Sequence, residues 1–543
     1  MAFDPDIPAG VDRRHFLKLA ASAAAATGLA PGAFGAGTLL GQERPPTATG
    51  QEAPPPVPLG NGEPPAFVFQ AYPGGTGSLL EKMWREDGGS PFERSPFEIE
   101  PWSGPVPGTE EDVAFLPVHR LAALIRGRHI SPTELTEIYL GRLKRYDPVL
   151  LCAVTILEGR GREEAQEAEA EIRAGQWKGP LHGIPWGVKD LFTVAGAPTT
   201  WGSEAFKDQV VEEDADVVRR MREAGAVLIA KLSTGEFARG DQWYRGRTNN
   251  PWNIEQGSSG SSAGPSSATA AGCVAFGIGS ETQGSITSPA RRCGLSALRP
   301  TFGRVSRHGG MVLAWSMDKV GPLCRSIEDC ALVFNTIHGA DEKDPATLTT
   351  PFRFQRNPDL SALRIGYDED APEAFVEALR ALGADPKPMT GIPSGSSNAL
   401  NVESAAALDF HIAPQIEAEA SLPETLSEEE LRGRNRFRSG RDVSALDFVQ
   451  SQRRRYLLMV GMAEAMEGFD MFVSGRGEVG LTNQTGHPAV VVPYDFGGDN
   501  PQPLTTTIIG DLFTDDKILS VAHAYQRSTD WHLRRPDLSR VGS

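Results

Sequence analysis

One stretch of this chain restricts its fold more than any other: a run of small residues that leads into apolar sequence and back. Residues 257–267 are entirely Gly, Ser, Ala and Pro, residues 268–278 are mostly apolar, and residues 279–288 return to Gly, Ser and Thr. A flexible Gly/Ser linker does not alternate with buried sequence in this way. Small residues instead let the backbone approach a reacting centre and leave amide N–H groups free to face an oxyanion. The stretch therefore predicts a catalytic loop built into a protein core.

Helix and strand patterns alternate along the rest of the chain. Residues 131–134 (Ser-Pro-Thr-Glu) form a capping box with proline at the first helical position, and apolar residues follow at helical spacing. Residues 214–223 predict a helix that Gly225 stops, and residues 226–230 predict a buried strand. Further helices are expected over 165–173, after Ser326 and over 515–525, and a further strand over 489–493. This order of helix, glycine and apolar strand indicates an α/β fold.

Composition and charge narrow the class of protein. The 543 residues are 40% hydrophobic and 23% charged, as in soluble globular proteins. Lys and Arg number 53 against 70 Asp and Glu, which gives a formal net charge of -17. This acidic balance disfavours nucleic acid and anionic membrane surfaces as partners. We expect a small-molecule substrate instead, and a homo-oligomer stays open.

Cysteine and histidine spacing predicts no disulfide framework, no metal and no other cofactor. The cysteines are few, odd in number and lack the spacing of metal ligands, so we expect them to be buried as small hydrophobes. The sequence contains no Cys-x-x-Cys, no His-Glu-x-x-His and no histidine cluster. The five cysteines are Cys152, Cys273, Cys293, Cys324 and Cys330.

Residues 1–37 resemble a twin-arginine export signal. Arg13 and Arg14 precede Phe-Leu-Lys at 16–18, and an Ala-rich, weakly apolar run follows over 19–30. This run is too short and too rich in Ala and Gly for a transmembrane helix, and no cysteine follows it to carry a lipid. We therefore expect export to the periplasm or another extracytoplasmic space, without a stable membrane anchor.

Residues 38–112 are interpreted as a linker and an N-terminal arm ahead of the main domain. Residues 38–65 are rich in Pro, Gly, Thr and Gln, as linkers are. Residues 66–112 carry scattered aromatic residues, which we expect to pack on the body because their exposure would be costly. A place at the substrate entrance is a further hypothesis for this arm. The main domain is expected over 113–535.

Two segments carry the strongest motifs. Residues 279–286 are Gly-Ser-Glu-Thr-Gln-Gly-Ser-Ile, and residues 181–190 are Leu-His-Gly-Ile-Pro-Trp-Gly-Val-Lys-Asp. Both resemble, in order and spacing, segments of the amidase signature family, and the likeness runs from about residue 113 to 530. Further matching motifs are Thr-Thr-Trp-Gly-Ser at 199–203, Asn-Pro-Trp at 250–252, Ser-Pro-Ala at 288–290, Cys-Gly-Leu at 293–295, Leu-Arg-Pro-Thr at 298–301, Gly-His-Pro-Ala at 486–489 and Asp515.

The resemblance implies an amide hydrolase with a single large α/β domain, in which helices flank a mixed central β-sheet. It gives Ser285 the role of nucleophile, Ser261 that of a bridging serine on a cis peptide, and Lys189 that of base. The family's spacing, counted back from Ser285 or forward from residues 250–252, gives Ser261 in both cases. The backbone N–H groups that match the family's oxyanion hole are those of Thr282, Gln283, Gly284 and Ser285.

The residue types fit acyl transfer. A serine hydroxyl is a poor nucleophile unless a base takes its proton, and lysine is such a base only when it is neutral. Burial disfavours the ammonium form and lowers the pKa of lysine. Ser261 would relay the proton of Ser285 to Lys189 and return a proton to the departing amine. The predicted activity is hydrolysis of a carboxylic amide, at C–N bonds other than peptide bonds, through an acyl-enzyme on Ser285.

Several positions depart from the family's pattern. Gln283 replaces a common glycine, and Thr287 stands where many members carry Arg. Residues 258–259 (Ser-Ser) replace a usual Pro-Gly, and Ala263 and Pro265 change the Gly/Ser run. None of these changes removes a catalytic hydroxyl or amine, but they leave the substrate class open. Linear amides, aryl amides, peptide amides, carbamates and esters all suit the mechanism.

Three other interpretations stay open. Residues 260–264 fit Gly-x-Ser-x-Gly, which in α/β-hydrolases places a nucleophile, here Ser262, on a strand-to-helix elbow; the polar residues before it, with Pro251, disfavour such a strand. A glutamine amidase subunit of a tRNA-dependent amidotransferase is disfavoured by the acidic charge and the export signal. A non-catalytic binding protein on the same scaffold is disfavoured by the intact triad. No histidine is needed as a base, so structural or pocket-lining roles are expected for His182, His308 and His487.

Overall fold

The computed structural model describes residue 80 and residues 92–419, 439–497 and 502–541. The predicted export signal over 1–37 and the predicted linker over 38–65 lie outside these residues. Within the described part of the chain, no helix combines the length and the apolar character needed to cross a membrane.

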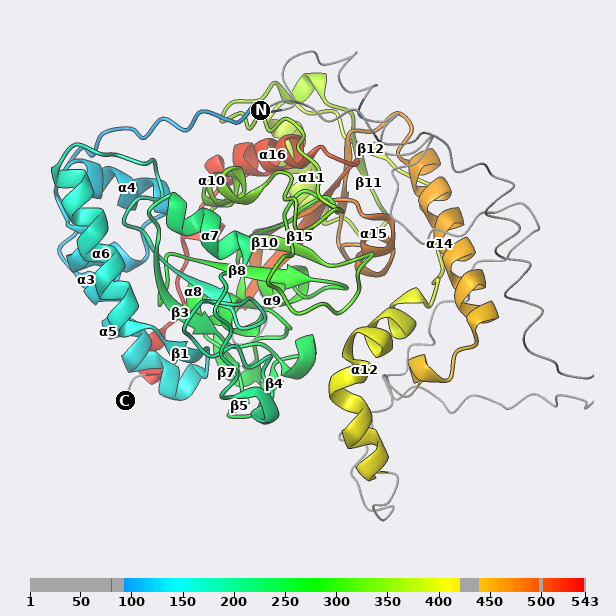
Figure 1. The fold of residues 1–543 in the computed structure, drawn as a ribbon. Coiled ribbons are helices and arrows are strands. Elements are labelled where there is room, and N and C mark those ends of the chain that lie inside the picture. The colour runs from blue at the N-terminus through cyan, green and yellow to red at the C-terminus, as the bar shows by residue number, and fades with distance from the viewer. Residues whose placement is uncertain (1–79, 81–91, 420–438, 498–501, 542–543) are drawn as a thin grey trace, which may run out of the picture. The chain divides into compact units, whose positions relative to one another are not determined.

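An eleven-stranded mixed sheet forms the centre of the fold (Figure 1), as predicted. Its strand order is β1-β3-β2-β8-β10-β9-β14-β15-β13-β11-β12. β2 is parallel to β3 and β8, and β11 is parallel to β12 and β13, whereas the other neighbours are antiparallel. The strands are β1 (Ala153–Ile156), β2 (Pro185–Lys189), β3 (Val227–Leu232), β8 (Phe276–Glu281), β9 (Ser296–Arg299), β10 (Lys319–Cys324), β11 (Ile365–Tyr367), β12 (Lys387–Pro388), β13 (Met471–Ser474), β14 (Ala489–Gly497) and β15 (Gln502–Gly510).

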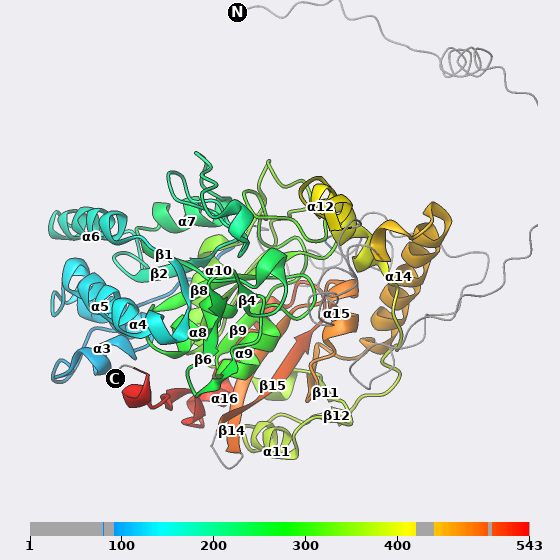
Figure 2. The same cartoon turned by 90° about the horizontal axis from the view of Figure 1, so that it is seen from below.

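Helices cover both faces of this sheet (Figures 1 and 2). In Figure 1, α10 and α16 lie above the central strands, and α8 and α9 lie below them. The helices are α3 (Glu110–Ala114), α4 (Val118–Arg126), α5 (Pro132–Leu150), α6 (Glu158–Arg173), α7 (Asp216–Glu223), α8 (Ala263–Ala270), α9 (Thr287–Cys293), α10 (Ile327–Ile337), α11 (Glu373–Ala381), α12 (Ala399–Glu419), α14 (Ala445–Ala465), α15 (Val479–Thr485) and α16 (Asp515–Arg527). Two short hairpins, β4 (Gln242–Trp243) with β5 (Gly246–Arg247) and β6 (Asn249–Asn250) with β7 (Asn253–Gly257), and five single-turn helices, η1 (Glu204–Phe206), η2 (Glu236–Ala238), η3 (Leu360–Ala362), η4 (Trp531–Leu533) and η5 (Leu538–Arg540), complete the described elements.

The elements predicted from the sequence are present; most boundaries differ by a few residues, and the largest difference is at the start of α6. The capping box of α5 forms, since Ser131 Oγ accepts from the N–H of Glu134 and the Glu134 carboxylate accepts from the N–H of Ser131. α6 begins at Glu158 and not near residue 165 as predicted. Gly161 lowers helix propensity there, but an added Cβ would come 3.0 Å from the side chain of Ile229, so the glycine allows α6 to pack closely on β3. All five cysteines are free and buried, as expected.

The small-residue stretch allows α8 to lie directly on β8. A Cβ at Gly277 would come within 3.0 Å of the backbone of α8, and one at Gly279 within 2.5 Å of Ser262 Oγ. Because both positions lack a side chain, the start of α8 reaches the carboxyl end of β8. β2 runs parallel to β8, so the carboxyl ends of both strands lie at one edge of the sheet. This arrangement brings Lys189, at the end of β2, toward Ser261, just before α8.

The described part of the N-terminal arm packs on the body. Ser95 Oγ donates to the carbonyl of Phe352 across 2.8 Å. The ring of Phe97 stacks on that of Phe354 with centroids 5.6 Å apart, and Ile99 is buried. Phe97 and Ile99 therefore lose solvent exposure against the body, whereas Phe92, at the start of the described arm, is 74% exposed and departs from the expected packing.

Candidate active site

The three residues of the predicted triad come from three segments. Lys189 is the last residue of β2, Ser261 precedes α8, and Ser285 lies in the loop between β8 and α9. The Nζ atom of Lys189 lies 2.8 Å from the Oγ atom of Ser261. It also donates to the hydroxyl and the carbonyl of Ser280, at 3.0 and 3.3 Å. The fold thus brings Lys189 and Ser261 into direct hydrogen-bond contact.

Burial gives Lys189 the character of a base. The side chain is fully buried, and this burial lowers its pKa to about 7, although the carboxylates of Asp318 and Glu281 oppose the shift. Within the described residues, the hydrogen-bond partners of Nζ are hydroxyl and carbonyl oxygens rather than a carboxylate. A neutral amine has two N–H groups and one lone pair, which fit donation to Ser280 and acceptance from the hydroxyl of Ser261. The site therefore favours a lysine that accepts a proton near neutral pH.

A second buried lysine provides a contrast. Nζ of Lys231 lies 2.8 Å from a carboxylate oxygen of Asp190 and 2.8 Å from Thr199 Oγ1. Asp190 also accepts a hydrogen bond from the N–H of Thr200 across 2.9 Å. Asp190, which follows Lys189 in the sequence, is therefore paired with Lys231. An ordinary surface ion pair between Lys189 and Asp190 is excluded, because both side chains are buried and the pairing lies elsewhere.

Ser261 and Ser262 are neighbours with different surroundings. The peptide bond Gly260–Ser261 is cis, as the family resemblance implies for the bridging serine. The hydroxyl of Ser262 donates to the carbonyl of Ser280 across 3.1 Å and accepts from its N–H across 3.2 Å. The N–H of Ser262 donates to the carbonyl of Ser285 across 3.0 Å. Ser262 thus connects the start of α8 to β8 and to the Ser285 loop, and its own hydroxyl is fully buried in that role.

Ser285 lies in a tight loop after β8. Gly284 has a φ of 92°, and a Cβ there would come 2.9 Å from Ser288 Oγ, so this position favours glycine. Among the hydrogen bonds between described residues, the N–H groups of Thr282, Gln283, Gly284 and Ser285 have no acceptor. These donors are available to an oxyanion. The same hydrogen bonds do not include one between the side chains of Ser261 and Ser285, and the two segments are joined through Ser262.

Glu281 is a site residue to which the sequence analysis assigned no role. One of its oxygens accepts from the N–H groups of Ile286 and Thr287, both at 2.8 Å. The other accepts from Arg299 at 3.1 Å and from Asn483 at 2.7 Å. Burial would raise the pKa of this carboxyl, but Arg299 and the hydrogen bonds lower it to about 2. A buried carboxylate therefore fixes the chain on the C-terminal side of Ser285.

A small cavity lies next to the Lys189–Ser261 pair. Its lining includes Ser261, Thr282 and Asp318, with further residues from the segment 307–313. Its volume of about 20 Å³ has room for about one water molecule. Thr282 Oγ1 donates to Asp318 across 2.5 Å, and Asp318 also accepts from the N–H of Leu313 across 2.8 Å. Asp318, like Glu281, is a supporting residue that the sequence analysis did not identify.

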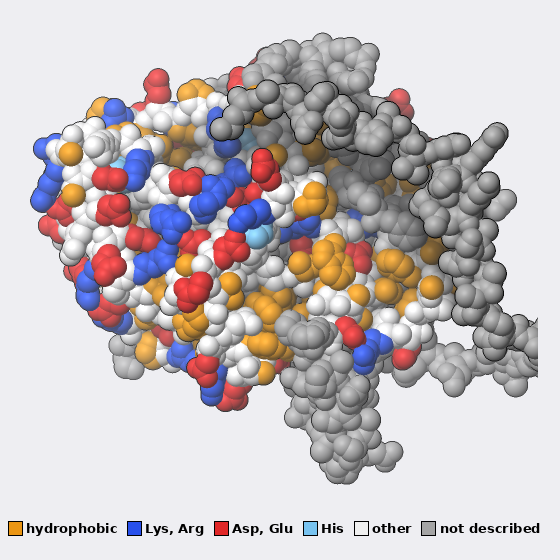
Figure 3. Space-filling view, viewed as in Figure 1, with side chains coloured by type: hydrophobic (Ala, Val, Ile, Leu, Met, Phe, Trp, Pro, Cys, Tyr) orange, Lys and Arg blue, Asp and Glu red, His pale blue; other side chains and the backbone are white. Residues whose placement is uncertain are grey.

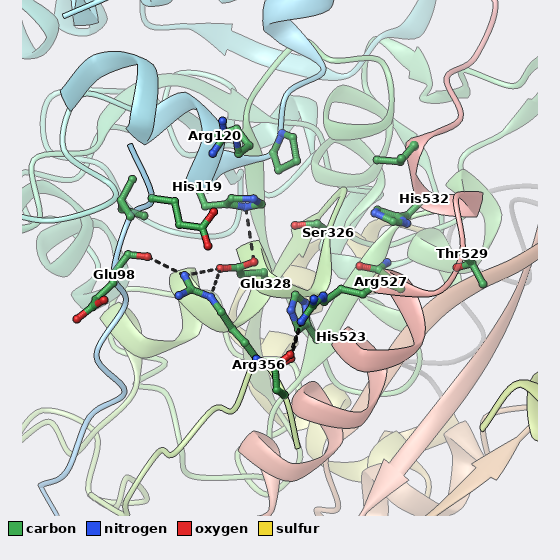
Figure 4. Close-up of a pocket in the computed structure, with 16 residues that line it drawn as sticks. Glu98, His119, Arg120, Ser326, Glu328, Arg356, His523, Arg527, Thr529 and His532 are labelled. Atoms are coloured by element: carbon green, nitrogen blue, oxygen red, sulfur yellow. Dashed lines mark hydrogen bonds and ion pairs between the residues drawn. The ribbon is translucent and has the colours of Figure 1, made fainter. Parts of the chain in front are cut away.

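A second cavity, of about 560 Å³, lies apart from the triad (Figure 4). It is lined by residues 98–100 of the arm and by residues of α4, α10 and α16. His523 and His532 line it, and burial lowers the pKa of each to about 4. None of the triad residues lines this cavity. The described part of the arm thus contributes to this cavity and not to the one at Ser261.

The histidines that were expected to be structural or pocket-lining have neighbours that fit those roles. His182 Nε2 lies 2.9 Å from Glu171, and His487 Nδ1 lies 2.8 Å from Thr485 Oγ1. Burial lowers the pKa of His487 to about 3. Among the residues that the structure describes, no group of three or more His, Cys, Asp or Glu side chains could hold a metal ion.

Comparison with known proteins gives matches over most of the chain. Residues 134–384 match the amidase family. The A subunit of glutamyl-tRNA(Gln) amidotransferase from Marinomonas sp. (strain MWYL1) is 30% identical over 78% of this chain and 99% of its own. The corresponding subunit from Methylococcus capsulatus is 32% identical over 77% of this chain and 97% of its own. The native peptide amidase from Stenotrophomonas maltophilia superposes with a TM-score of 0.67 at 28% identity, over 77% of this chain and 98% of the amidase.

Proposed function

Because the chain belongs to the amidase signature family, whose hydrolases act on carbon–nitrogen bonds, we propose that it hydrolyses a carboxylic amide through an acyl-enzyme on Ser285. The observation that carries the proposal is the contact of 2.8 Å between Lys189 Nζ and Ser261 Oγ. The lowered pKa of this lysine, about 7, suits a general base near neutral pH. The unpaired N–H groups of the Ser285 loop add the matching oxyanion site.

Acylation follows from these positions. The hydroxyl of Ser285 attacks the amide carbonyl carbon while its proton passes to Ser261, whose own proton passes to Lys189. The carbonyl oxygen becomes an oxyanion that the N–H groups of residues 282–285 stabilise. Lys189 then returns the proton through Ser261 to the leaving nitrogen, the C–N bond breaks, and ammonia or an amine departs. Catalytic hydrogen bonds often tighten only in the substrate complex, which suits the relay from Ser285 to Ser261.

Deacylation uses the same groups in reverse. A water molecule attacks the ester carbonyl on Ser285 and loses its proton through Ser261 to Lys189. The second tetrahedral intermediate then collapses, Ser285 regains a proton through the relay, and the carboxylic acid leaves. Each cycle consumes one amide and one water and yields one acid and one amine or ammonia. No metal, redox partner or other cofactor takes part in these steps.

Two measurements test this function. A panel of linear, aryl and peptide amides, with detection of ammonia and amine, should reveal turnover of at least one amide. A fluorophosphonate probe should label the protein, and peptide mapping should place the label on Ser285. A protein that turns over no amide and takes the label at another residue would reject the proposal.

The relatives favour a second candidate, a glutamine amidase subunit that supplies ammonia within a larger complex. The A subunits of glutamyl-tRNA(Gln) amidotransferase match this chain over nearly their whole length. The formal net charge of -17 and the predicted export signal favour a small amide and no nucleic acid partner. Measurement of ammonia release from free glutamine distinguishes a general amide hydrolase from a glutamine amidase subunit. A strong preference of the purified protein for glutamine over other amides would support the subunit.

We also propose that residues 1–37 direct export of the protein from the cytoplasm. The support is the pair Arg13 and Arg14 ahead of a short Ala-rich run. In this proposal the amidase domain over 113–535 works in the periplasm or another extracytoplasmic space, with residues 38–112 as linker and arm. Cell fractionation of the full-length protein tests the location.

A further inference from the structure

A large groove lies next to the small cavity at Ser261. We call it the α12–α14 groove; its walls are residues within 302–316 and 343–348 and, from the two helices, within 402–406 and 448–452. Figures 1 and 2 both show α12 and α14, in yellow and orange, next to each other. The volume of the groove is about 960 Å³, which is the size of a small-molecule site. Arg307, Gly310 and Val312 line both the groove and the cavity at Ser261, so the two spaces share a wall.

The charged side chains in this wall are held by partners. Arg307 donates two hydrogen bonds to the carboxylate of Asp344, at 2.7 and 2.8 Å. Lys343 forms an ion pair with Glu213, which does not line the groove. Glu403 accepts from the N–H and the hydroxyl of Ser316, at 3.0 and 2.5 Å. A charged ligand would have to displace one of these partners, and so the groove is suited to an uncharged one.

Much of the remaining surface of the groove is apolar. Its lining includes Phe302, Val312, Trp315, Leu348 and Phe448. The side chain of Trp315 is 51% exposed, which is high for so large a hydrophobic residue. Figure 3 shows hydrophobic side chains gathered near the middle of the face it draws, beside a region where acidic and basic side chains alternate. A concave surface with this much exposed apolar area is typical of a binding site.

The small cavity leaves no space for a bulky substituent at Ser261 itself. Its volume of about 20 Å³ accepts a group the size of a water molecule, so the rest of a larger substrate has to lie elsewhere. We propose that the α12–α14 groove holds a large, uncharged apolar substituent of the amide substrate, aromatic or branched aliphatic. This inference rests on the proposed amide hydrolysis and names its substrate class: amides with one bulky apolar group.

A substrate series with groove variants tests this inference. The series contains acetamide, naphthaleneacetamide, which has its bulk on the acyl side, and N-naphthylacetamide, which has it on the amine side. We expect kcat/KM for at least one naphthyl amide to exceed that for acetamide at least about tenfold. Ala406→Trp fills the groove and Trp315→Ala removes an apolar wall. Each should lower the ratio of naphthyl amide to acetamide at least about tenfold, and the naphthyl amide that responds identifies the side of the bond.

Leu533→Ala is the matched control. Leu533 is an exposed apolar residue, 58% accessible, that lines the second cavity of Figure 4 instead of the groove. Its substitution should leave the ratio of naphthyl amide to acetamide within about twofold of the original protein. A protein without preference for naphthyl amides, or a ratio that both groove substitutions leave unchanged, would overturn the inference.

Calorimetric titration measures binding in the groove independently of catalysis. Naphthaleneacetamide and N-naphthylacetamide are each titrated into Ser285→Ala protein, in which no acyl-enzyme can form. At least one should bind, and Ala406→Trp in the same background should weaken that binding at least about tenfold. If the active protein turns over no amide, the proposed function fails, but this titration still shows whether the groove binds the naphthyl group. Absence of binding for both, or equal binding with Ala406→Trp, would overturn the inference alone.

Discussion

The Nζ atom of Lys189 lies 2.8 Å from Oγ of Ser261, although the two residues are 72 positions apart in the chain. The contact depends on the parallel pairing of β2 with β8 and on the close packing of α8 against β8. It differs from the pairing of Lys231, a second buried lysine, which contacts the carboxylate of Asp190. A buried lysine with a hydroxyl partner and no carboxylate contact is poised to exchange protons, and this relationship motivates the first prediction.

Activity should rise with pH through the pKa of Lys189. Burial lowers this pKa to about 7, so the lysine is protonated and inactive as a base below that value and neutral above it. A profile of kcat/KM against pH, which reports groups of the free enzyme, should therefore climb between about pH 6 and about pH 8 and then level off. A profile that is flat from about pH 6 to about pH 9 would contradict the role of Lys189.

Lys189→Arg is the matched variant for that role. Arginine keeps the positive charge but does not lose its proton in proteins, so the variant should show no turnover at any pH in the range. Circular dichroism spectra of the variant and the original protein should agree if the loss is chemical. An active Lys189→Arg enzyme would show that another group serves as the base.

Ser285→Ala should abolish turnover by removing the nucleophile. The expected loss in kcat is at least about a thousandfold, as for other enzymes that lose a covalent nucleophile. Ser288→Ala is the control, because Ser288 lies in the first turn of α9, close to Gly284, without a role in the proposed chemistry. Initial rates on the best amide of the panel measure both. Similar activities for the two variants would be incompatible with an acyl-enzyme on Ser285.

Glu281→Gln should destabilise the protein and reduce its activity together. The carboxylate is buried against Arg299, so its loss leaves a buried guanidinium without its partner, at a cost of about 3–5 kcal/mol. The shift of the loop after Ser285 should lower kcat as well, since Glu281 holds the N–H groups of Ile286 and Thr287. Thermal unfolding and initial rates measure the two effects.

The pH dependence of this contribution has a definite sign. The folded-state pKa of Glu281 is about 2, below the value of an unfolded glutamate, so the stabilisation is fully present above the unfolded pKa. It is lost as the pH falls from about 4.5 toward about 2.

Glu223→Gln is the control for Glu281→Gln: Glu223 is 60% exposed in its pair with Arg219, and its loss should cost less than about 1 kcal/mol. Equal shifts of the thermal unfolding midpoint for Glu281→Gln and Glu223→Gln would show that Glu281 does not support the site.

The sequence predicts the elements of this fold better than the support of its site. The capping box before α5 and the glycine after α7 are local signals, since the residues that produce them are adjacent in the chain. The partners of Glu281 come from β9 and α15, and no spacing rule reveals which distant residues meet. The available signal in the sequence was the position of Glu281 within a Gly/Ser-rich run. A charged residue buried there requires partners, and so indicates a supporting role.

Motif spacing predicts the proposed catalytic residues, and the structure adds what spacing cannot give. The count from Ser285 to Ser261 distinguishes two adjacent serines, but only the contacts show that Ser262 is engaged with Ser280. The α12–α14 groove was not predicted at all. Its walls come from loops and helices separated by long stretches of chain, and these segments carry no recognisable motif.

Replacement of the arginine pair should block export. The predicted signal depends on Arg13 and Arg14, and twin-arginine recognition reads the guanidinium pair, so the double change to lysine should retain precursor in the cytoplasm. Arg44→Lys, in the predicted linker, is the control and should be exported normally. Fractionation followed by immunoblotting measures the distribution. Equal export of the double variant and the control would show that this segment is not the signal.

The last prediction separates Ser261 from Ser262. The proposed relay passes every proton between Ser285 and Lys189 through Ser261, so Ser261→Ala should lower kcat at least about a hundredfold, the usual contribution of a positioned acid–base group. Ser262→Ala should cost less in rate, because its hydroxyl makes structural hydrogen bonds to Ser280 worth about 1 kcal/mol each. That variant should instead show a lower thermal midpoint.

The two serine variants are best measured with Ser285→Ala on the same amide and with the same fluorophosphonate probe. Ser262→Ala should still take the label on Ser285, whereas Ser261→Ala should take it far more slowly, since the nucleophile has lost its route to the base. Burial of the Ser262 hydroxyl also argues that it is not itself labelled. A label on Ser262, together with an active Ser285→Ala enzyme, would overturn the mechanism, because the oxyanion donors of residues 282–285 would then stand beside an idle serine.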